Sequence, residues 1–248
     1  MTGETFRDDL FRGKVALISG GTSGIGAAVG DALAALGARV TVTGATQLEA
    51  DNAKQREGFR CERAIALDVR DEQAIAACVR EMGSLDILVN CAGVIRRDAE
   101  HDPNVFAEVV DVNLTGTMRL CTAARPLLAD GAGCIINTAS MYSFFGGPHA
   151  PGYTASKGGI AQLTKSLAVA YAKDKIRVNA IAPGWIATPL TDVVRSDALK
   201  SAAILARTPL GRWGNPADLA GVVAFLCSPA AGFVTGVILP VDGGYLVS

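Results

Sequence analysis

Tyr153 and Lys157 are four residues apart, and their side chains could together move a proton at neutral pH. If the chain from Gly152 onward is helical, both side chains project from one face of the helix. An ammonium group beside a phenol favours the phenolate, so we expect Lys157 to lower the pKa of Tyr153 from about 10 toward neutrality. Ser140 lies thirteen residues before Tyr153, and its hydroxyl could bind the oxygen that gains or loses the proton. These groups suit acid–base chemistry on an alcohol or carbonyl oxygen.

The spacing alone is not specific, because Tyr171 and Lys175 repeat it. Thirteen residues before Tyr171 the chain has Gly158, which carries no hydroxyl. Lys173 and Asp174 indicate that this second pair lies at the polar end of a helix. We therefore interpret Tyr171 as a structural residue.

The length and composition predict one large α/β domain with a well-buried core. The chain has 248 residues, of which 50% are hydrophobic, and its mean hydropathy is +0.30. The formal net charge is −1, and no run of lysine and arginine indicates binding to nucleic acid or to an anionic membrane. We therefore expect a small molecule as the partner.

Cysteine and histidine usage excludes several other classes of site. The six cysteines form no CxxC pair and lie mostly in apolar segments, as expected of reduced thiols in a cytoplasmic protein. The two histidines, His101 and His149, are in different segments, so we expect neither a metal site nor a Ser-His-Asp triad. The stretch from Met1 to Lys14 lacks an apolar core, so we expect no signal peptide, and no later stretch has the length of a membrane span.

Short apolar runs alternate with segments of helical periodicity along the chain. We expect seven buried strands, at 15–18, 40–42, 65–67, 85–89, 134–137, 178–181 and 237–239. Strands that are buried on both faces and separated by helices predict a parallel sheet with right-handed crossovers. The predicted fold class is α/β, with one Rossmann-type doubly wound sheet over residues 1–248 and helices on both faces. The stretch around 184–214 is rich in proline and glycine, and we expect it to be an irregular substrate loop or lid.

A glycine-rich turn follows the first predicted strand and opens the first helix. It contains Gly20, Gly24 and Gly26, which let the backbone come close to a pyrophosphate beside the N–H groups of a helix start. No Lys-Ser or Lys-Thr pair follows the turn, which excludes a P-loop. At the first strand-to-helix junction of a doubly wound sheet, such a turn favours a nucleotide site.

Taken in order, several short motifs resemble those of the short-chain dehydrogenase/reductase family. They are Gly20-xxx-Gly24-x-Gly26, Asn90-Cys91-Ala92-Gly93, Asn113, Ser140, Tyr153, Lys157 and Pro183-Gly184. Each motif is weak by itself, but the ordered set runs nearly the whole chain and is specific. Two positions depart from the family pattern, with Ser19 for threonine and Cys91 for a second asparagine, and neither change removes the chemistry.

The resemblance implies a role for each matching residue. Tyr153 would be the general acid or base, Lys157 would lower its pKa and bind the nicotinamide ribose, and Ser140 would bind the substrate oxygen. Asn113 would lie in a helix and order a water for a proton relay. The implied cofactor contacts are Gly20, Thr22, Ser23, Gly24, Ile25 and Gly26 at the turn, Asp68 and Val69 at the adenine, Asn90, Ala92 and Gly93 at the ribose, and Pro183, Gly184, Ile186 and Thr188 near the nicotinamide, together with Tyr153 and Lys157. The cofactor would supply the hydride.

Three of these residues also have structural interpretations. Asp68 could cap a helix that begins near Asp71. Asn113 could be a helix residue that bonds a neighbouring backbone group, and Thr188 before Pro189 could belong to an ordinary loop.

The end of the second strand bears on the choice between NAD(H) and NADP(H). Gly44 stands where NAD-dependent members often have aspartate, while Ala45 and Ser23 stand where NADP-dependent members can be basic. A 2′-phosphate without a cationic partner would be poorly held. The sequence therefore slightly favours NAD(H), although no aspartate repels NADP(H).

Within the family, the segments 92–97, 153–157 and 211–214 look most like gluconate 5-dehydrogenases and 2-dehydro-3-deoxy-gluconate dehydrogenases. Arg96 or Arg97 could bind a sugar-acid carboxylate bidentately, or both could be solvated surface or interface cations. The expected substrate contacts are Ser140, Met141, His149, Trp185 and Arg96, with Leu190 as a further wall residue. The predicted reaction is reversible NAD(P)-dependent hydride transfer between a secondary alcohol and a ketone, on a sugar acid or polyol.

Other functions remain open at this point. The first alternative is a 3-oxoacyl-[acyl-carrier-protein] reductase or a broad ketone reductase, and the second is a non-catalytic nucleotide-binding sensor. The sensor has no reason to retain Asn113, Ser140, Tyr153 and Lys157 together. By resemblance we expect a homotetramer that pairs the helix carrying the tyrosine and lysine.

Overall fold

The seven predicted strands are all present in the computed structural model, which describes residues 6–248. The start of the stretch in which we expect no signal peptide, Met1 to Thr5, lies outside the described residues. The strands are β1 (Val15–Ser19), β2 (Arg39–Gly44), β3 (Arg63–Ala66), β4 (Ile87–Asn90), β5 (Cys134–Thr138), β6 (Arg177–Pro183) and β7 (Ile238–Val241). They form one sheet in the order β3-β2-β1-β4-β5-β6-β7, and every neighbouring pair is parallel. The predicted fold class is confirmed.

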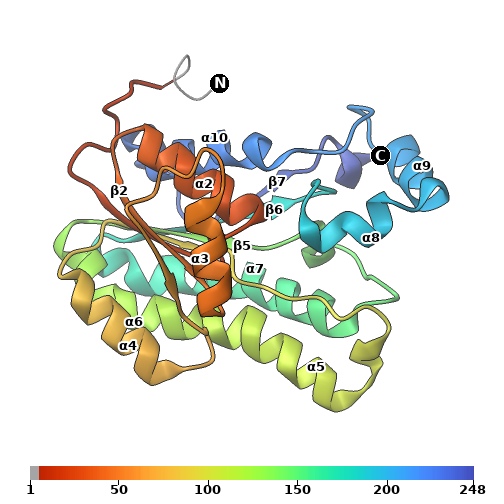
Figure 1. Ribbon diagram of the computed structural model, residues 1–248, viewed down its shortest axis with the longest axis horizontal. Helices are drawn as coiled ribbons and strands as arrows, with labels where there is room; N and C mark the ends of the chain where they lie inside the picture. The colour runs from red at the N-terminus through yellow and green to blue at the C-terminus, as the bar shows by residue number, and fades with distance from the viewer. Residues whose placement is uncertain (1–5) are drawn as a thin grey trace.

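Helices cover both faces of the sheet (Figure 1). They are α2 (Gly24–Ala35), α3 (Gln47–Gln55), α4 (Glu72–Met82), α5 (Pro103–Val110), α6 (Gly116–Asp130), α7 (Pro151–Tyr171), α8 (Asp192–Arg195), α9 (Ala198–Arg207) and α10 (Pro216–Cys227). Helices α2 and α10 pack together on one face, and α4, α6 and α7 cover the other. Among residues 6–248, no helix combines the length and apolar character needed to cross a bilayer.

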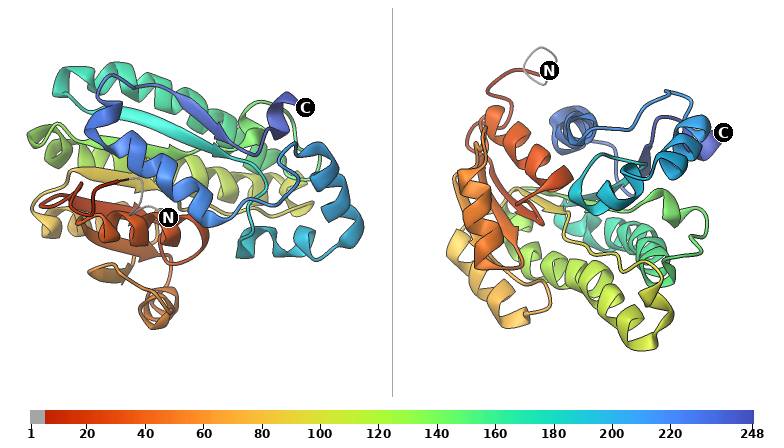
Figure 2. Two further views of the ribbon diagram at one scale, coloured as in Figure 1. Left: turned by 90° about the horizontal axis from the view of Figure 1, so that it is seen from above. Right: turned by 45° about the vertical axis from the view of Figure 1, so that its right-hand side comes forward.

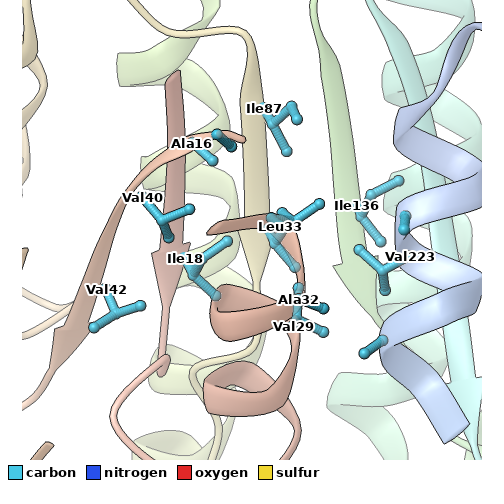
Figure 3. Packing of buried hydrophobic residues seen from close by; sticks show 14 of the residues in the cluster. Ala16, Ile18, Val29, Ala32, Leu33, Val40, Val42, Ile87, Ile136 and Val223 are labelled. Carbon is cyan, nitrogen blue, oxygen red and sulfur yellow. The ribbon is translucent and has the colours of Figure 1, made fainter. Parts of the chain in front are cut away.

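Alternating residues of the strands supply the two cores. Ile18 packs in the cluster under α2 and α10, and Figure 3 shows it beside Leu33 of α2. Its neighbour Leu17 belongs to the cluster on the opposite face, because successive side chains of a strand point to opposite sides. Tyr171 is buried in that second cluster with the guanidinium of Arg125 4.4 Å from its ring centroid. This position fits the structural interpretation of Tyr171.

The strand order creates a switch point between β1 and β4. The chain proceeds from β1 outward to β2 and β3, and from β4 outward to β7 in the opposite direction. Ser19 and Asn90, the last residues of β1 and β4, are paired in register. In doubly wound sheets, ligands bind outside the carboxyl ends of the strands at such a point.

The stretch 184–214 was predicted to be irregular, and this is wrong, because it contains α8 and α9. Asp197 starts α9, and its carboxylate accepts hydrogen bonds from the N–H groups of Leu199 and Lys200. The prolines and glycines at both ends of the stretch hid this short helical pattern. The backbones of Ile186 and Gly214 pair at its base, so the segment leaves the domain and returns at one place. The segment lies at one end of the molecule, beside the C-terminus (Figures 1 and 2).

Candidate active site

A cavity of about 520 Å³ lies at the carboxyl ends of the strands, where the switch point predicts a ligand site. Both the glycine-rich turn and the predicted acid–base residues line it. Its walls include Gly20, Thr22, Ser23, Gly24, Ile25, Gly26, Asp68, Val69, Ala92, Gly93, Ser140, Tyr153, Lys157, Pro183, Gly184, Ile186 and Thr188. The structure thus brings together predicted residues from six separate segments of the sequence. Asn90 and Asn113 are the members of the predicted catalytic and cofactor sets that do not line it.

The glycine-rich turn fits a dinucleotide. Gly20 has a φ of +64°, and a Cβ there would lie 2.5 Å from the backbone nitrogen of Ala92, so only glycine lets these two loops touch. Helix α2 begins at Gly24, and its N-cap residue Ser23 makes no side-chain capping bond. The N–H groups of the first turn of α2 therefore remain available to a phosphate group.

Asn90, the last residue of β4, is buried and does not line the cavity. Its Nδ2 donates to Oδ1 of Asn137 at 2.9 Å and to Sγ of Cys121 at 3.4 Å. The cavity wall here consists of Cys91, Ala92 and Gly93. Asn90 therefore holds the strand ends in place below that wall.

Asn113 is fully buried in a π-helical turn, η2 (Asp111–Thr115). Its Oδ1 accepts from the N–H of Val94 at 2.8 Å, and its Nδ2 donates to the carbonyl of Val94 at 2.9 Å. Nδ2 also donates to Oγ of Ser156 at 3.1 Å, and that hydroxyl donates to the carbonyl of Tyr153 at 2.7 Å. These bonds match the interpretation of Asn113 as a helix residue bonding backbone, while its part in a proton relay stays a prediction. Ser156 was not predicted, because nothing in the sequence distinguishes it from other serines.

Helix α7 carries Tyr153 and Lys157 as predicted. It begins with Pro151 at its first position and runs for 21 residues. The ammonium of Lys157 donates to the carbonyl of Thr138 at 2.7 Å and lies 5.5 Å from the centroid of the Tyr153 ring. Ser140 follows β5 and begins a 3₁₀ turn, η3 (Met141–Ser143), in which its hydroxyl accepts from the N–H of Tyr142. The helix and the end of β5 together place Ser140, Tyr153 and Lys157 in the cavity wall.

The predicted lowering of the Tyr153 pKa by Lys157 is not found. Burial raises the pKa of Tyr153 to about 12, and hydrogen bonding to Ser140 offsets this only in part. Burial also lowers the pKa of Lys157 to about 8. The lysine ammonium lies over the ring and is bonded to Thr138, so it does not stabilise the phenolate oxygen enough to outweigh burial.

Lys157→Met should remove a pH dependence of stability. Lys157 has a pKa of about 8 in the folded protein, against an ordinary value of 10.5. Between these values the unfolded chain binds more protons, so the free energy of unfolding should rise with pH, by about 2 kcal/mol between pH 8 and 10. Tyr153 contributes in another window, because its raised pKa costs stability only as the pH rises from 10 through 12. Urea unfolding of the wild type and the variant at several pH values measures the difference.

The exposed Lys165 of the same helix provides the control for this experiment. Lys165→Met should leave the rise in unfolding free energy as it is in the wild type. A difference between wild type and Lys157→Met that stays flat from pH 8 to 10 would contradict the buried ammonium.

Arg96 and Arg97 differ in their exposure and in the groups that they contact. Arg96 is exposed, lines the cavity and lies 3.7 Å from a carboxylate oxygen of Glu108. Arg97 is half-buried, with its guanidinium carbon 5.9 Å from the ring centroid of Trp185, and its charge lowers the pKa of Tyr153. Within residues 6–248, no hydrogen bond or ion pair engages the side chain of Arg97, although its backbone carbonyl accepts from the N–H of Ala99 at 2.8 Å. It is therefore the arginine that is free to bind an anion near Tyr153.

Of the other predicted substrate residues, Leu190 lines the cavity, whereas Met141, His149 and Trp185 do not. Met141 is buried at the start of its 3₁₀ turn. The exposed side chain of His149 binds Asp98 through Nδ1 at 2.7 Å. Trp185 packs edge-to-face on Trp213, and Leu190 lines the cavity.

Glu49 is a cavity residue that the sequence interpretation missed. Its Oε2 accepts from the N–H of Ala45 at 2.7 Å, and both residues line the cavity beside Thr22. A Cβ on Gly44 would lie 2.7 Å from the same oxygen, so glycine makes room for the carboxylate. Thr46 and Glu49 have the spacing of a capping box, which could have indicated a carboxylate folded back over the strand end.

The cap interpretation of Asp68 is wrong. Asp71 caps α4, since its Oδ1 accepts from the N–H of Ala74 at 2.9 Å. Asp68 instead lines the cavity and binds Arg70, with 2.6 Å between the nearest atoms. Thr188 also lines the cavity, and its backbone N–H donates a hydrogen bond to Oγ1 of Thr191.

Comparisons with known proteins agree with this geometry. Residues 20–246 match the family model described as Enoyl-(Acyl carrier protein) reductase. The chain is 43% identical over 243 residues to a 2-dehydro-3-deoxy-D-gluconate 5-dehydrogenase of Bacillus subtilis, across 95% of both proteins. It is 40% identical to a galactitol 2-dehydrogenase (L-tagatose-forming) of Cereibacter sphaeroides, across 95% of this chain and 96% of the relative.

A solved structure supports the same relationship. The crystal structure of a gluconate 5-dehydrogenase from Burkholderia cenocepacia, in complex with NADP and tartrate, has a TM-score of 0.89 to this chain. Its sequence is 33% identical to this chain, and the match covers 98% of this chain and 100% of the Burkholderia chain. The relatives confirm the predicted reaction class, NAD(P)-dependent hydride transfer between an alcohol and a ketone. The chain is a member of the short-chain dehydrogenase/reductase family.

Proposed function

We propose that this enzyme reversibly oxidises a secondary hydroxyl of a sugar acid and prefers NAD(H). The observation that carries the proposal is that Ser140, Tyr153 and Lys157 line the same cavity as the glycine-rich turn. Two of the relatives described above are named for gluconate or a gluconate derivative, and one for a polyol. These names support a polyhydroxylated substrate.

In this proposal the chain handles the proton and the orientation of the reactants. Nicotinamide, when bound, supplies or accepts the hydride. Tyr153 donates a proton to the substrate oxygen in reduction and removes it in oxidation, and Ser140 donates a hydrogen bond to the same oxygen. A tyrosine whose pKa is about 12 is fully protonated at neutral pH, which suits it to act first as the acid. Lys157 holds the ribose hydroxyls, and Asn113 orders a water that returns the proton to solvent.

We infer that Arg97 binds the carboxylate of the substrate. Its guanidinium lies near both Trp185 and Tyr153 and is free of protein carboxylates within the described residues. The planar guanidinium matches a carboxylate bidentately. The indole N–H of Trp185 is buried and has no partner within residues 6–248, so it provides a second donor for a polar substrate.

Initial rates on a substrate panel test the proposal. D-gluconate, 2-dehydro-3-deoxy-D-gluconate, galactitol and a bulky apolar ketone should be tried with both cofactors. We expect turnover of a sugar acid, with the polyol slower. Turnover confined to the apolar ketone would contradict the proposal and favour the broad ketone reductase.

The preference for NAD(H) rests on Glu49. The carboxylate of Glu49 lies at the end of β2, where a nicotinamide dinucleotide would place its adenosine ribose. A ribose 2′-hydroxyl can donate to this carboxylate, whereas a 2′-phosphate would be repelled by it. The cavity cations Arg70 and Arg96 are paired with Asp68 and Glu108, so neither is free to bind a phosphate.

Glu49→Gln should therefore shift the cofactor preference toward NADP(H). We expect the wild-type kcat/KM to be at least tenfold higher with NAD(H), and the ratio to fall about tenfold in the variant as the like-charge repulsion is lost. Glu62→Gln is the matched control, because Glu62 is exposed and binds Arg39 outside the cavity. A tenfold wild-type preference for NADP(H), the cofactor in the Burkholderia structure, would overturn the inference.

We also propose a cytoplasmic homotetramer whose segment 184–214 closes over the substrate. The six cysteines are free, as expected in a reducing compartment. Val169 on α7 and Phe233 near β7 are large exposed apolar side chains, at 81% and 104% relative exposure, that a subunit contact would cover. Mass photometry distinguishes a tetramer from the 25.5 kDa monomer.

A further inference from the structure

Glu100 is a buried carboxylate that joins two parts of the site. It lies in a 3₁₀ turn, η1 (Ala99–His101), and is 1% exposed. Its Oε1 accepts from the N–H of Arg96 at 2.6 Å, and its Oε2 accepts from the N–H of Tyr153 at 2.7 Å. One side chain thus holds the backbone of both the arginine pair and the reactive tyrosine.

The start of α7 has no capping side chain of its own. Its N-cap residue is Ala150, and Pro151 at the first position has no N–H to donate. The N–H of Tyr153, at the third position, would be left without a partner inside the helix. Glu100 supplies that partner from 53 residues away, and its negative charge is favourable at the positive end of the helix dipole.

Other hydrogen bonds also join the loop around Glu100 to the residues just before α7, but the residues that make them are exposed. The N–H of Asp98 donates to the carbonyl of His149 at 2.7 Å, and the Asp98 carboxylate binds the His149 ring with both side chains mostly exposed. An exposed pair of this kind contributes little to stability. The buried carboxylate of Glu100 is therefore the stronger link between Arg97, which lies within the 96–100 segment, and Tyr153.

We propose that Glu100 is a positioning residue that fixes Tyr153 and Arg97 relative to each other, so that an anionic substrate bound by Arg97 presents its hydroxyl to Tyr153. This proposal rests on the functions proposed above for those two residues. Hydrogen bonds to a charged carboxylate are stronger than neutral ones, and a misplacement of about 1 Å in an active site can cost about 100-fold in rate.

The charge of Glu100 gives a readout that a purely structural link would not move. The groups that face the Tyr153 phenol are Ser140 after β5, Tyr142 in η3, Arg97 and Glu100 after β4, and Lys157 on α7. Among these, the hydroxyl of Ser140 and the charge of Arg97 lower the pKa of Tyr153, while Tyr142 and, to a smaller extent, Glu100 raise it. Removing the negative charge at residue 100 should therefore lower the pKa of Tyr153, whereas moving the carboxylate should not.

Glu100→Gln and Glu100→Asp separate charge from position, with D-gluconate and NAD⁺ as the probes. We expect Glu100→Gln to lower kcat about 10- to 100-fold, to leave the dissociation constant of NAD⁺ within about twofold, and to lower the kinetic pKa in the pH profile of kcat. Glu100→Asp keeps the charge but is too short to reach both N–H groups, so kcat should fall while the kinetic pKa stays. Asp71→Asn, which removes the cap of α4, should change neither.

Two results would overturn the positioning role. One is a Glu100→Gln enzyme with kcat within twofold of the wild type, and the other is a reduced kcat with an unmoved pH profile. If circular dichroism shows that Glu100→Gln does not fold, the shorter Glu100→Asp decides, and an unchanged kcat in that variant would refute the proposal. Loss of the function proposed for Tyr153 would show separately, as full activity in Tyr153→Phe.

Discussion

Tyr153→Phe should lower kcat by about 10³-fold or more and leave NAD⁺ binding nearly unchanged. The substitution removes only the hydroxyl, whose proton we propose is exchanged with the substrate oxygen, and a positioned acid or base contributes about 10²- to 10⁴-fold to a rate. The ring remains and still packs edge-to-face on the ring of Tyr142, with 6.1 Å between the two ring centroids. Stopped-flow or steady-state production of NADH from D-gluconate gives kcat, and fluorescence titration gives the dissociation constant.

The chain provides a matched control in Tyr171→Phe. Tyr171 has the same spacing to a lysine as Tyr153, but it is the last residue of α7 and is buried in the hydrophobic core. We expect its kcat to stay within a few fold of the wild type, with at most a loss of stability. A Tyr153→Phe enzyme that keeps more than a tenth of wild-type kcat would contradict the general acid–base role of Tyr153 and would favour the non-catalytic alternative.

Arg97→Ala should lower kcat/KM for a sugar acid about 10- to 100-fold while changing that for galactitol less than threefold. Hydrogen bonds to charged groups contribute about 1.5–3 kcal/mol, and the substitution removes the guanidinium that would make them to the substrate carboxylate. The polyol has no carboxylate, so it provides an internal reference for any disturbance of the site. Arg97→Lys should recover part of the loss, because it restores the charge without the planar fork.

Arg96→Ala is the control for the neighbouring cation. Arg96 is exposed and lies beside Glu108, so its removal should have a small effect on both substrates. Equal losses on the acid and the polyol in Arg97→Ala would contradict a carboxylate contact. A selective loss in Arg96→Ala alone would transfer that contact to Arg96.

The sheet could be predicted from the sequence because its signals are local. The inner strands β1, β2, β4, β5 and β6 are short runs that are almost wholly buried, so they stand out from the amphipathic helices between them. The edge strands β3 and β7 are only partly buried. The glycine-rich turn and the Tyr153–Lys157 pair are likewise short motifs with fixed spacing. Helix α9 was missed because it is short and lies between prolines and glycines, which the sequence pattern presents as loop.

The parts of the site that could not be predicted depend on contacts between distant residues. Glu100 reaches Tyr153 across 53 positions, and no periodicity indicates that a carboxylate in one loop will cap a helix elsewhere. Asn90 belongs to a recognisable motif, yet its direction depends on Asn137 in the neighbouring strand. The raised pKa of Tyr153 reflects the burial of its own phenol group, which the spacing of Tyr153 and Lys157 does not reveal.

A crystal structure of the ternary complex with NAD⁺ and a sugar acid gives the most decisive measurement. The oxygen of the reacting carbon should lie about 2.6–3.2 Å from both Oη of Tyr153 and Oγ of Ser140, with the substrate carboxylate on Arg97. A reacting oxygen bound away from both hydroxyls would contradict the proposed proton transfer, and a carboxylate bound elsewhere would contradict the role of Arg97.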